Sequence, residues 1–184
     1  MTRRLLMQSA PSVEQLVRED LVRGAALAID LAVFEGDGVK EPLGIVNTSD
    51  VNTVAVNSDG SPTWAEIVDF ESAVDADNAL MGSLGYVTTA AVRGNLKTTS
   101  KDTGSGRFLL EDGLVNGYPL YVSTQLASNR IIFGNFADAM IGMWGVLEVK
   151  PDEAALAASG GLVLRVFQDV DVGIRHGESF AYGT

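Results

Sequence analysis

The sequence predicts an α+β fold that contains one long helix, two shorter helices and several mixed or antiparallel strands. Three observations predict it: an amphipathic stretch at residues 12–35, two capped helical segments near residues 63 and 89, and short apolar runs bounded by Gly, Asn and Asp. A long early helix followed by short helices and mostly antiparallel strands is typical of the α+β class.

The stretch "SVEQLVREDLVRGAALAIDLAVFE" at residues 12–35 is expected to form the long helix. Ser12 is expected as the N-cap, with Gln15 in the capping-box position. Gly36 then supplies a C-terminal stop. At 1.5 Å per residue the helix would be roughly 35 Å long, which suits a spine rather than a small packing helix. The apolar residues recur along one stripe: Val13, Leu16, Val17, Leu21, Ala25, Ala28 and Leu31.

The next segment, "EGDGVKEPLGIVN" at residues 35–47, is expected to be a structural junction. Gly36 and Gly38 permit a sharp reversal of the chain, and Pro42 stiffens its exit. A glycine-flanked acid also suggests a phosphate loop. Phosphate loops, however, lead into the positive N-terminus of a helix, whereas this turn follows a helix and would face its negative end. A hinge between two structural lobes is therefore favoured over a ligand loop.

The middle of the chain is expected to alternate strands, turns and two short helices. Residues 43–60 suggest strands and exposed turns. Thr63 and Glu66 form a capping-box pair before a helix whose apolar face carries Trp64, Ile67, Val68 and Val74. A brief strand then leads into a second short helix capped near Thr88 or Thr89, and "SKDTGSGRF" at residues 100–108 reads as a mobile surface loop.

The last third of the chain is expected to consist mainly of strands. Asn116-Gly117 is a hairpin signal between two apolar runs. Residues 129–149 read as a strand, a turn and a second strand, and residues 150–161 as a loop. The closing segment alternates apolar and polar residues, with a bend expected at Gly173.

The composition excludes several function classes. The chain has 184 residues, no cysteine, a single histidine and a formal net charge of −11 with a pI of about 4.4. Disulfides, thiolate metal sites and cysteine nucleophiles are therefore excluded. The acidic balance argues against nucleic acid as a direct, sequence-specific ligand. No apolar run is long enough to span a bilayer and the N-terminus lacks a signal-peptide pattern, so we expect a soluble chain made in a cytoplasm, without membrane contact.

The search for catalytic or cofactor-binding motifs predicts no enzyme site, no cofactor and no metal. Asp75, Asp77 and Asn78 resemble the start of a calcium loop, but the glycine and glutamate required at its sixth and twelfth positions are missing. Ser105 lies outside a nucleophile elbow, and His176 is expected to be a partly exposed residue at a strand end. A catalytic pair of carboxylates, as in glycosidases, stays an open possibility, because the distance between two residues in the sequence says little about their distance in the folded chain. A small hydrolase using carboxylates and His176 is the least favoured alternative.

Several segments, taken in order, resemble the major capsid proteins of tailed bacteriophages with the Hong Kong 97-like fold. The first is "RRLLMQSAPSVEQLVREDLVRGAALAIDLAVFEGDGVKEPLGIVN", which is similar to that family's spine helix and following turn. "GYVTTAAVRGNLKTT", "SGRFLLEDG" with "VNGYPLYVSTQL", "IIFGNFADAMIGMWGVLEV" and "LRVFQDVDVGIRHGESFA" follow in the family's order. Asn135 stands where the family commonly has Asp, and Gly177 where Pro is usual.

The resemblance implies a structural subunit with two lobes. Residues 1–40 and 143–184 would form a peripheral lobe with the spine helix, and residues 41–142 an axial lobe. It implies self-assembly into pentamers and hexamers of an icosahedral phage or prophage head around DNA, in contact with scaffold, protease or portal proteins, and location in the virion. Because the family's N-terminal arm and hairpin are missing, a truncated form is expected. An encapsulin-like nanocompartment shell, which shares the fold, is the alternative.

Overall fold

The computed structural model describes residues 11–57, 59–104, 106–152, 154–159 and 163–183. The chain divides into two compact units. Unit 1 combines Met1–Asp30 with Gly142–Asp171, and unit 2 combines Leu31–Ile141 with Val172–Thr184. Residues 31–40 and 172–184, which were expected in the peripheral lobe, therefore belong to the same unit as the middle of the chain. The division into a peripheral and an axial lobe stays a prediction.

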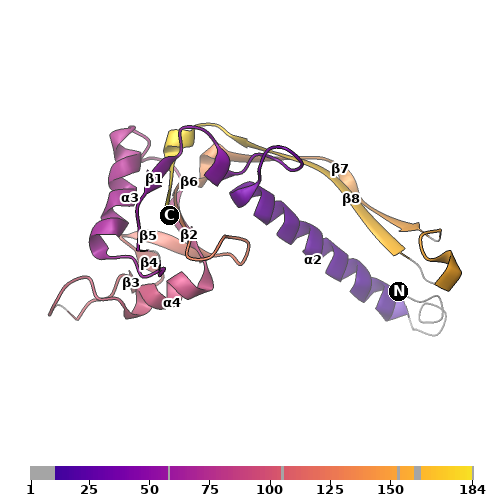
Figure 1. The fold of residues 1–184 in the computed structure, drawn as a ribbon, viewed down its shortest axis with the longest axis horizontal. Helices are drawn as coiled ribbons and strands as arrows, with labels where there is room; N and C mark the ends of the chain where they lie inside the picture. Colours follow the sequence, from indigo (N-terminus) through magenta and orange to yellow (C-terminus); the bar gives the residue numbers. More distant parts are fainter. Residues whose placement is uncertain (1–10, 58, 105, 153, 160–162, 184) are drawn as a thin grey trace. The chain divides into compact units, whose positions relative to one another are not determined.

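The long helix α2 (Pro11–Glu35) confirms the predicted spine (Figure 1). The prediction that Ser12 is the N-cap is wrong, because the helix already includes Pro11 and Ser12. Proline suits the first turn of a helix, where its missing N–H costs no hydrogen bond. The predicted apolar stripe is only partly covered: Val17 and Leu21 are half-buried, whereas Leu16 and Leu31 are exposed.

Unit 2 is built on a seven-stranded mixed sheet with the order β1-β9-β6-β2-β5-β4-β3 (Figure 1). The pairs β1–β9 and β2–β5 are parallel, and the other pairs are antiparallel. The strands are β1 (Asn52–Val54), β2 (Leu84–Thr88), β3 (Leu110–Glu111), β4 (Leu114–Val115), β5 (Tyr118–Val122), β6 (Ile131–Asn135) and β9 (Phe180–Gly183). Short 3-10 turns precede β1 (η1, Ile45–Asn47), follow β6 (η2, Phe136–Asp138) and precede β9 (η4, Gly177–Ser179).

Two helices pack on this sheet as their caps predict. Helix α3 (Trp64–Ala76) begins with a full capping box, in which the Thr63 N–H donates to Glu66 Oε2 at 2.7 Å and the Glu66 N–H donates back to Thr63 Oγ1 at 3.3 Å. Helix α4 (Ala90–Thr98) is capped by Thr89. The two helices share one core cluster with the sheet, to which α3 contributes Ile67, Phe70 and Val74 and α4 contributes Val92 and Leu96.

The centre of that core is aromatic. Tyr86 and Phe133, paired across β2 and β6, are fully buried with ring centroids 4.5 Å apart. The Tyr86 hydroxyl donates to the carbonyl of Ile67 at 3.2 Å, which satisfies a polar atom that burial would otherwise leave unpaired. The predicted Asn116-Gly117 hairpin is confirmed between β4 and β5, with φ values of 51° and 84°.

Unit 1 consists of the first part of α2 and most of a two-stranded ribbon, β7 (Ala139–Asp152) and β8 (Val163–Ile174), with the 3-10 turn η3 (Ala157–Ser159) between the strands; residues 139–141 and 172–174 of the ribbon belong to unit 2. The bend expected at Gly173 is wrong, since β8 continues through it. The irregularity lies in β7, where Gly145 has a φ of 74°, a conformation typical of a β-bulge. Among the described residues, no helix has the length and apolar character needed to cross a membrane.

Candidate functional site: the junction after α2

The predicted junction residues lie together at the C-terminus of α2. The chain reverses at Gly38, which has a φ of 71°, and Asp37 and Leu43 form an isolated antiparallel bridge across the reversal. The Gly44 N–H then donates to the Gly36 carbonyl at 2.9 Å. The returning segment therefore closes directly onto the end of the helix.

The junction depends on close approach of backbone to backbone. A Cβ atom on Gly36 would collide with the carbonyl oxygen of Pro42 and would lie 2.6 Å from that of Ala32. A Cβ on Gly44 would lie 2.5 Å from the Gly36 nitrogen, 2.7 Å from the Ala32 oxygen and 2.8 Å from the Glu35 nitrogen. None of these atoms belongs to a side chain that could turn away. Gly44 is thus as important as the predicted Gly36, although the sequence pattern did not single it out.

Side chains complete the closure by capping the free carbonyl groups of the helix. Asn47 Nδ2 donates to the Glu35 carbonyl at 2.9 Å and to the Gly36 carbonyl at 3.0 Å. The last carbonyls of a helix have no partner within it, so this amide supplies the missing bond at Glu35 and adds a second donor, beside the Gly44 N–H, at Gly36. Within the turn, Asp37 Oδ1 accepts the Val39 N–H at 2.8 Å, and backbone hydrogen bonds of this kind hold the pKa of Asp37 below its usual value.

A charged pair ties the helix end to the rest of unit 2. The Glu35 carboxylate accepts the Ala127 N–H at 3.1 Å and lies 3.3 Å from Arg130 Nε. The Arg130 guanidinium also lies over the Tyr182 ring, 5.3 Å from its centroid. Both charged side chains are mostly covered, so the pair is less screened than a surface salt bridge. These contacts join the C-terminal end of α2 to residues 127, 130 and 182 within unit 2.

The candidate catalytic residues do not assemble into a site. His176 is exposed, and its imidazole has no hydrogen-bond partner among the described residues. Nearby, Ser179 Oγ donates directly to Asp138 Oδ2 at 2.9 Å. In a nucleophilic triad the histidine stands between the hydroxyl and the carboxylate, and here it does not. Ser105 lies outside the described residues.

The calcium-like residues serve to end α3. Asn78 adopts a φ of 57° just beyond the helix, and Asp77 accepts a hydrogen bond from Asn52 Nδ2 at 2.9 Å. Their arrangement is that of a solvated helix end. In the part of the chain that the structure describes, no group of three or more His, Asp or Glu side chains is placed to hold a metal ion.

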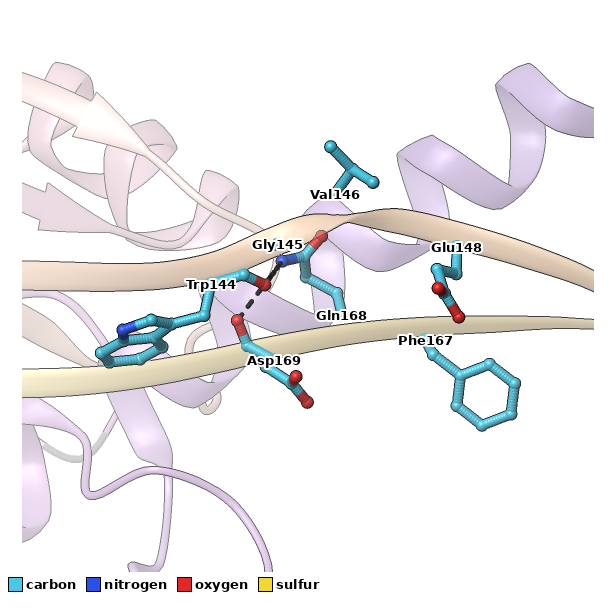
Figure 2. A pocket seen from close by; sticks show the side chains of 7 residues that line it. All are labelled: Trp144, Gly145, Val146, Glu148, Phe167, Gln168 and Asp169. Carbon is cyan, nitrogen blue, oxygen red and sulfur yellow. Dashed lines mark hydrogen bonds between the residues drawn. The ribbon is translucent and has the colours of Figure 1, made fainter.

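An exposed aromatic pocket, missed by the sequence analysis, lies on the ribbon of unit 1 (Figure 2). It has a volume of about 310 Å³, and Trp144 and Phe167, from the two strands, stay 59% and 51% exposed. A Cβ on Gly142 would lie 2.6 Å from the Trp144 ring, so the indole lies against a bare backbone. Gln168 Nε2 donates to the Trp144 carbonyl at 3.1 Å beside the bulge. The pocket is lined by Trp144, Gly145, Val146, Glu148, Phe167, Gln168 and Asp169.

Comparisons with known proteins agree on one family. A family model described as the phage capsid family matches residues 1–184. The chain is similar to the major capsid protein of Halomonas phage phiHAP-1, with 38% identity over 181 residues, covering 98% of the chain and 30% of the relative. It is 25% identical over 211 residues to the major capsid protein of Klebsiella oxytoca phage phiKO2, covering 98% of the chain and 48% of the relative.

The fold comparison gives the same result. The capsid of a native GTA particle, computed with C5 symmetry, matches with a TM-score of 0.77 at 20% identity, covering 99% of this chain and 68% of that one. At this identity the match shows a shared fold. The chain spans less than half the length of both sequence relatives, 30% and 48%.

Proposed function

Because the chain belongs to the phage capsid family, we propose that it is a coat subunit of a phage or prophage head, of the major capsid type. The observation that carries the proposal is the family match over the whole chain together with a fold shared with phage-type capsids. The family is a structural one and not an enzyme family. The predicted Hong Kong 97-like fold is thereby confirmed.

The distribution of apolar surface supports self-association. Five large apolar side chains on β7 and β8 are half or more exposed, namely Met140, Met143, Trp144, Val146 and Phe167. Clusters of exposed apolar side chains are unusual on monomeric proteins and mark interfaces, where aromatic residues are enriched. Burial of this ribbon against neighbouring subunits would offset the mutual repulsion of chains that each carry a net charge of −11.

The proposed product is a closed shell of pentamers and hexamers around DNA, located in the virion. The C5 symmetry of the GTA capsid is the kind of ring that pentamers require. In this proposal the acidic chain encloses DNA without binding its sequence, since tight phosphate binding needs clustered cations. Contacts with scaffold, protease or portal proteins, and the split into a peripheral and an axial lobe, belong to the proposal. So does the role of Gly36, Gly38 and Pro42 as the joint that sets the subunit's shape.

An encapsulin-like shell shares the fold, so the fold alone does not separate it from a phage head. The sequence relatives favour the phage head, because both are named as major capsid proteins of phages. A hydrolase based on His176 has no support in the geometry, since the imidazole has no partner among the described residues.

Electron microscopy and sedimentation velocity of two purified proteins test the proposal. One is the chain itself, and the other is the chain extended with the regions by which the Halomonas phage relative exceeds it. Rings or shells from either protein are the expected result. If both remain monomeric at tens of micromolar protein, the coat-subunit proposal is wrong.

A further inference from the structure

Charge is segregated along the chain between two neighbouring segments of unit 2. Residues 59–77 contain six acidic residues and no Lys or Arg, whereas residues 78–101 contain three basic residues and no Asp or Glu. The first segment forms α3 and the second forms β2 and α4. The acids are Asp59, Glu66, Asp69, Glu71, Asp75 and Asp77, and the bases are Arg93, Lys97 and Lys101.

The outward faces of these helices carry charges that make no ion pair with the residues that the structure describes. Asp69 and Asp75 on α3 are exposed, as are Arg93 and Lys97 on α4. Among the described residues, none of the four makes an ion pair. Lys101 is different, because its ammonium group lies 4.3 Å from the centre of the Trp64 ring at the start of α3 and is used within the subunit.

The α4 face is also shaped for close approach. Between its two cations lies Gly94, which has open space where a Cβ would stand. Ala90 and Ala91, at the start of the helix, are exposed as well. Small side chains let a partner approach the helix while the long Arg93 and Lys97 side chains reach past them to its carboxylates.

The sheet places the two faces toward different ends of one compact unit. Helix α3 contacts β1, β9 and β6, which lie at one end of the strand order, whereas α4 contacts β3, the strand at the other end. Both helices pack into the same core cluster, so their places on the unit are fixed by buried side chains. Figure 1 shows α3 and α4 as separate helices beside the sheet. A subunit therefore presents an acidic face and a basic face at different positions.

We propose that the α4 face (Arg93 and Lys97) of one subunit docks on the α3 face (Asp69 and Asp75) of a second copy of this chain. The partner is a second copy because both halves of the complementary pair are present on one chain and neither makes an ion pair among the described residues. Two different faces make a head-to-tail contact, which closes into a ring when the rotation permits. The inference rests on the proposed coat-subunit function and identifies which surfaces meet within a ring.

Charge reversal on each face tests the contact. Arg93→Glu with Lys97→Glu makes both faces acidic, and Asp69→Lys with Asp75→Lys makes both faces basic. Each variant alone is expected to self-associate at least about tenfold more weakly than wild type in sedimentation velocity, because like charges then meet at the contact. An equal mixture of the two variants restores opposite charges at every contact and is expected to recover association.

The mixture makes a further prediction about ring size. Its two variants must alternate around a ring, so only rings with an even number of subunits can close, and electron microscopy should show hexamers without pentamers. The matched control is Lys40→Glu with Arg175→Glu, two exposed cations elsewhere in unit 2 that produce the same change in net charge. This control should associate like wild type at equal ionic strength.

Because the chain contains no cysteine, disulfide trapping gives a second test. Asp75→Cys and Lys97→Cys are expected to form a covalent dimer when mixed under oxidation, and neither should dimerise efficiently alone. Lys40→Cys mixed with Glu178→Cys is the control pair. Wild-type assembly with neither charge sensitivity nor cross-linking would overturn this contact and leave the coat-subunit function intact. Failure to cross-link, together with a wild type that stays monomeric both as this chain and in the extended form, would overturn both.

Discussion

Substitution of Gly44 by alanine should destabilise unit 2 severely, although alanine adds only one methyl group. The added Cβ would lie 2.5–2.8 Å from three backbone atoms in the last turn of α2 and just after it. The returning segment must then move away, which costs about 1–3 kcal/mol for overpacking. The movement also weakens the bond from Gly44 to the Gly36 carbonyl and the Asn47 cap, each worth about 1 kcal/mol. The expected loss is roughly 3–5 kcal/mol.

The matched control is Gly94→Ala, in the middle of α4 in the same unit, where no atom lies within 4 Å of the new Cβ. Alanine is favoured over glycine in a helix by about 1 kcal/mol, so this variant should be more stable than wild type. The same chemical change thus has opposite signs at the two positions.

Urea denaturation followed by tryptophan fluorescence measures both effects. Trp64 packs against the core of unit 2, and a Trp144→Phe background leaves it as the sole tryptophan. Thermal midpoints should fall by roughly 10 °C for Gly44→Ala, since each kcal/mol shifts a chain of this size by about 2–4 °C. A Gly44→Ala variant within about 0.5 kcal/mol of wild type would refute the close-packed joint.

Three other predictions concern single side chains. Burial and its hydrogen bond to a carboxylate raise the pKa of Tyr118 to about 12, so its neutral form stabilises the fold below pH 10. This stability should be lost between about pH 10 and 12, and Tyr118→Phe should flatten the alkaline limb of the urea midpoint against pH. The side-chain amide of Asn135 donates to Asp138 at 2.9 Å, and Asn135→Asp would place a second carboxylate there. We expect this variant to lose about 2 kcal/mol of folding stability at pH 7 and to recover it below about pH 5, where a carboxylate is protonated. Equal stability of the variant at both pH values would contradict this. Gly142→Ala should displace the Trp144 indole and change its fluorescence without lowering the stability of unit 2, and an unchanged spectrum would count against the packing described.

The helices of unit 2 were predictable because their signals are local. The Thr63–Glu66 capping box and the Thr89 cap each lie within four residues of the helix that they begin. The hairpin at Asn116-Gly117 was predictable for the same reason, since its left-handed backbone favours those two residues.

The junction was only half predictable. Gly36, Gly38 and Pro42 are visible as turn formers, but Gly44 and Asn47 act on atoms eight to twelve residues away. No periodic pattern reports such contacts. The Glu35–Arg130 pair joins residues even farther apart and gives no local signal. A bend was expected at Gly173 because glycine interrupts strands, yet the interruption lies at Gly145, whose neighbouring carbonyl is held by Gln168.

The exposed ribbon also differs from what sequence reasoning assumes. Phe133 and Trp144 both lie in the apolar stretch of residues 129–149. In the structure Trp144 is 59% exposed, whereas Phe133 is in the core. The apolar pattern of a sequence cannot separate a core residue from an interface residue, because a side chain covered by its own chain and one covered by a neighbouring subunit are both apolar.

The position of β9 between β1 and β6 has a consequence for synthesis of the chain. Strand β1 pairs within the sheet only with β9, in a register that joins Asn52 to Ala181. At 5–20 residues per second a ribosome needs roughly 6–26 s to make the residues that separate these partners. Until β9 has been made the sheet cannot close, and once β6 has been made its Ile132 and Phe133 have no neighbour on their β9 side. Unit 2 therefore cannot complete its sheet before the residues of β9 have been synthesised.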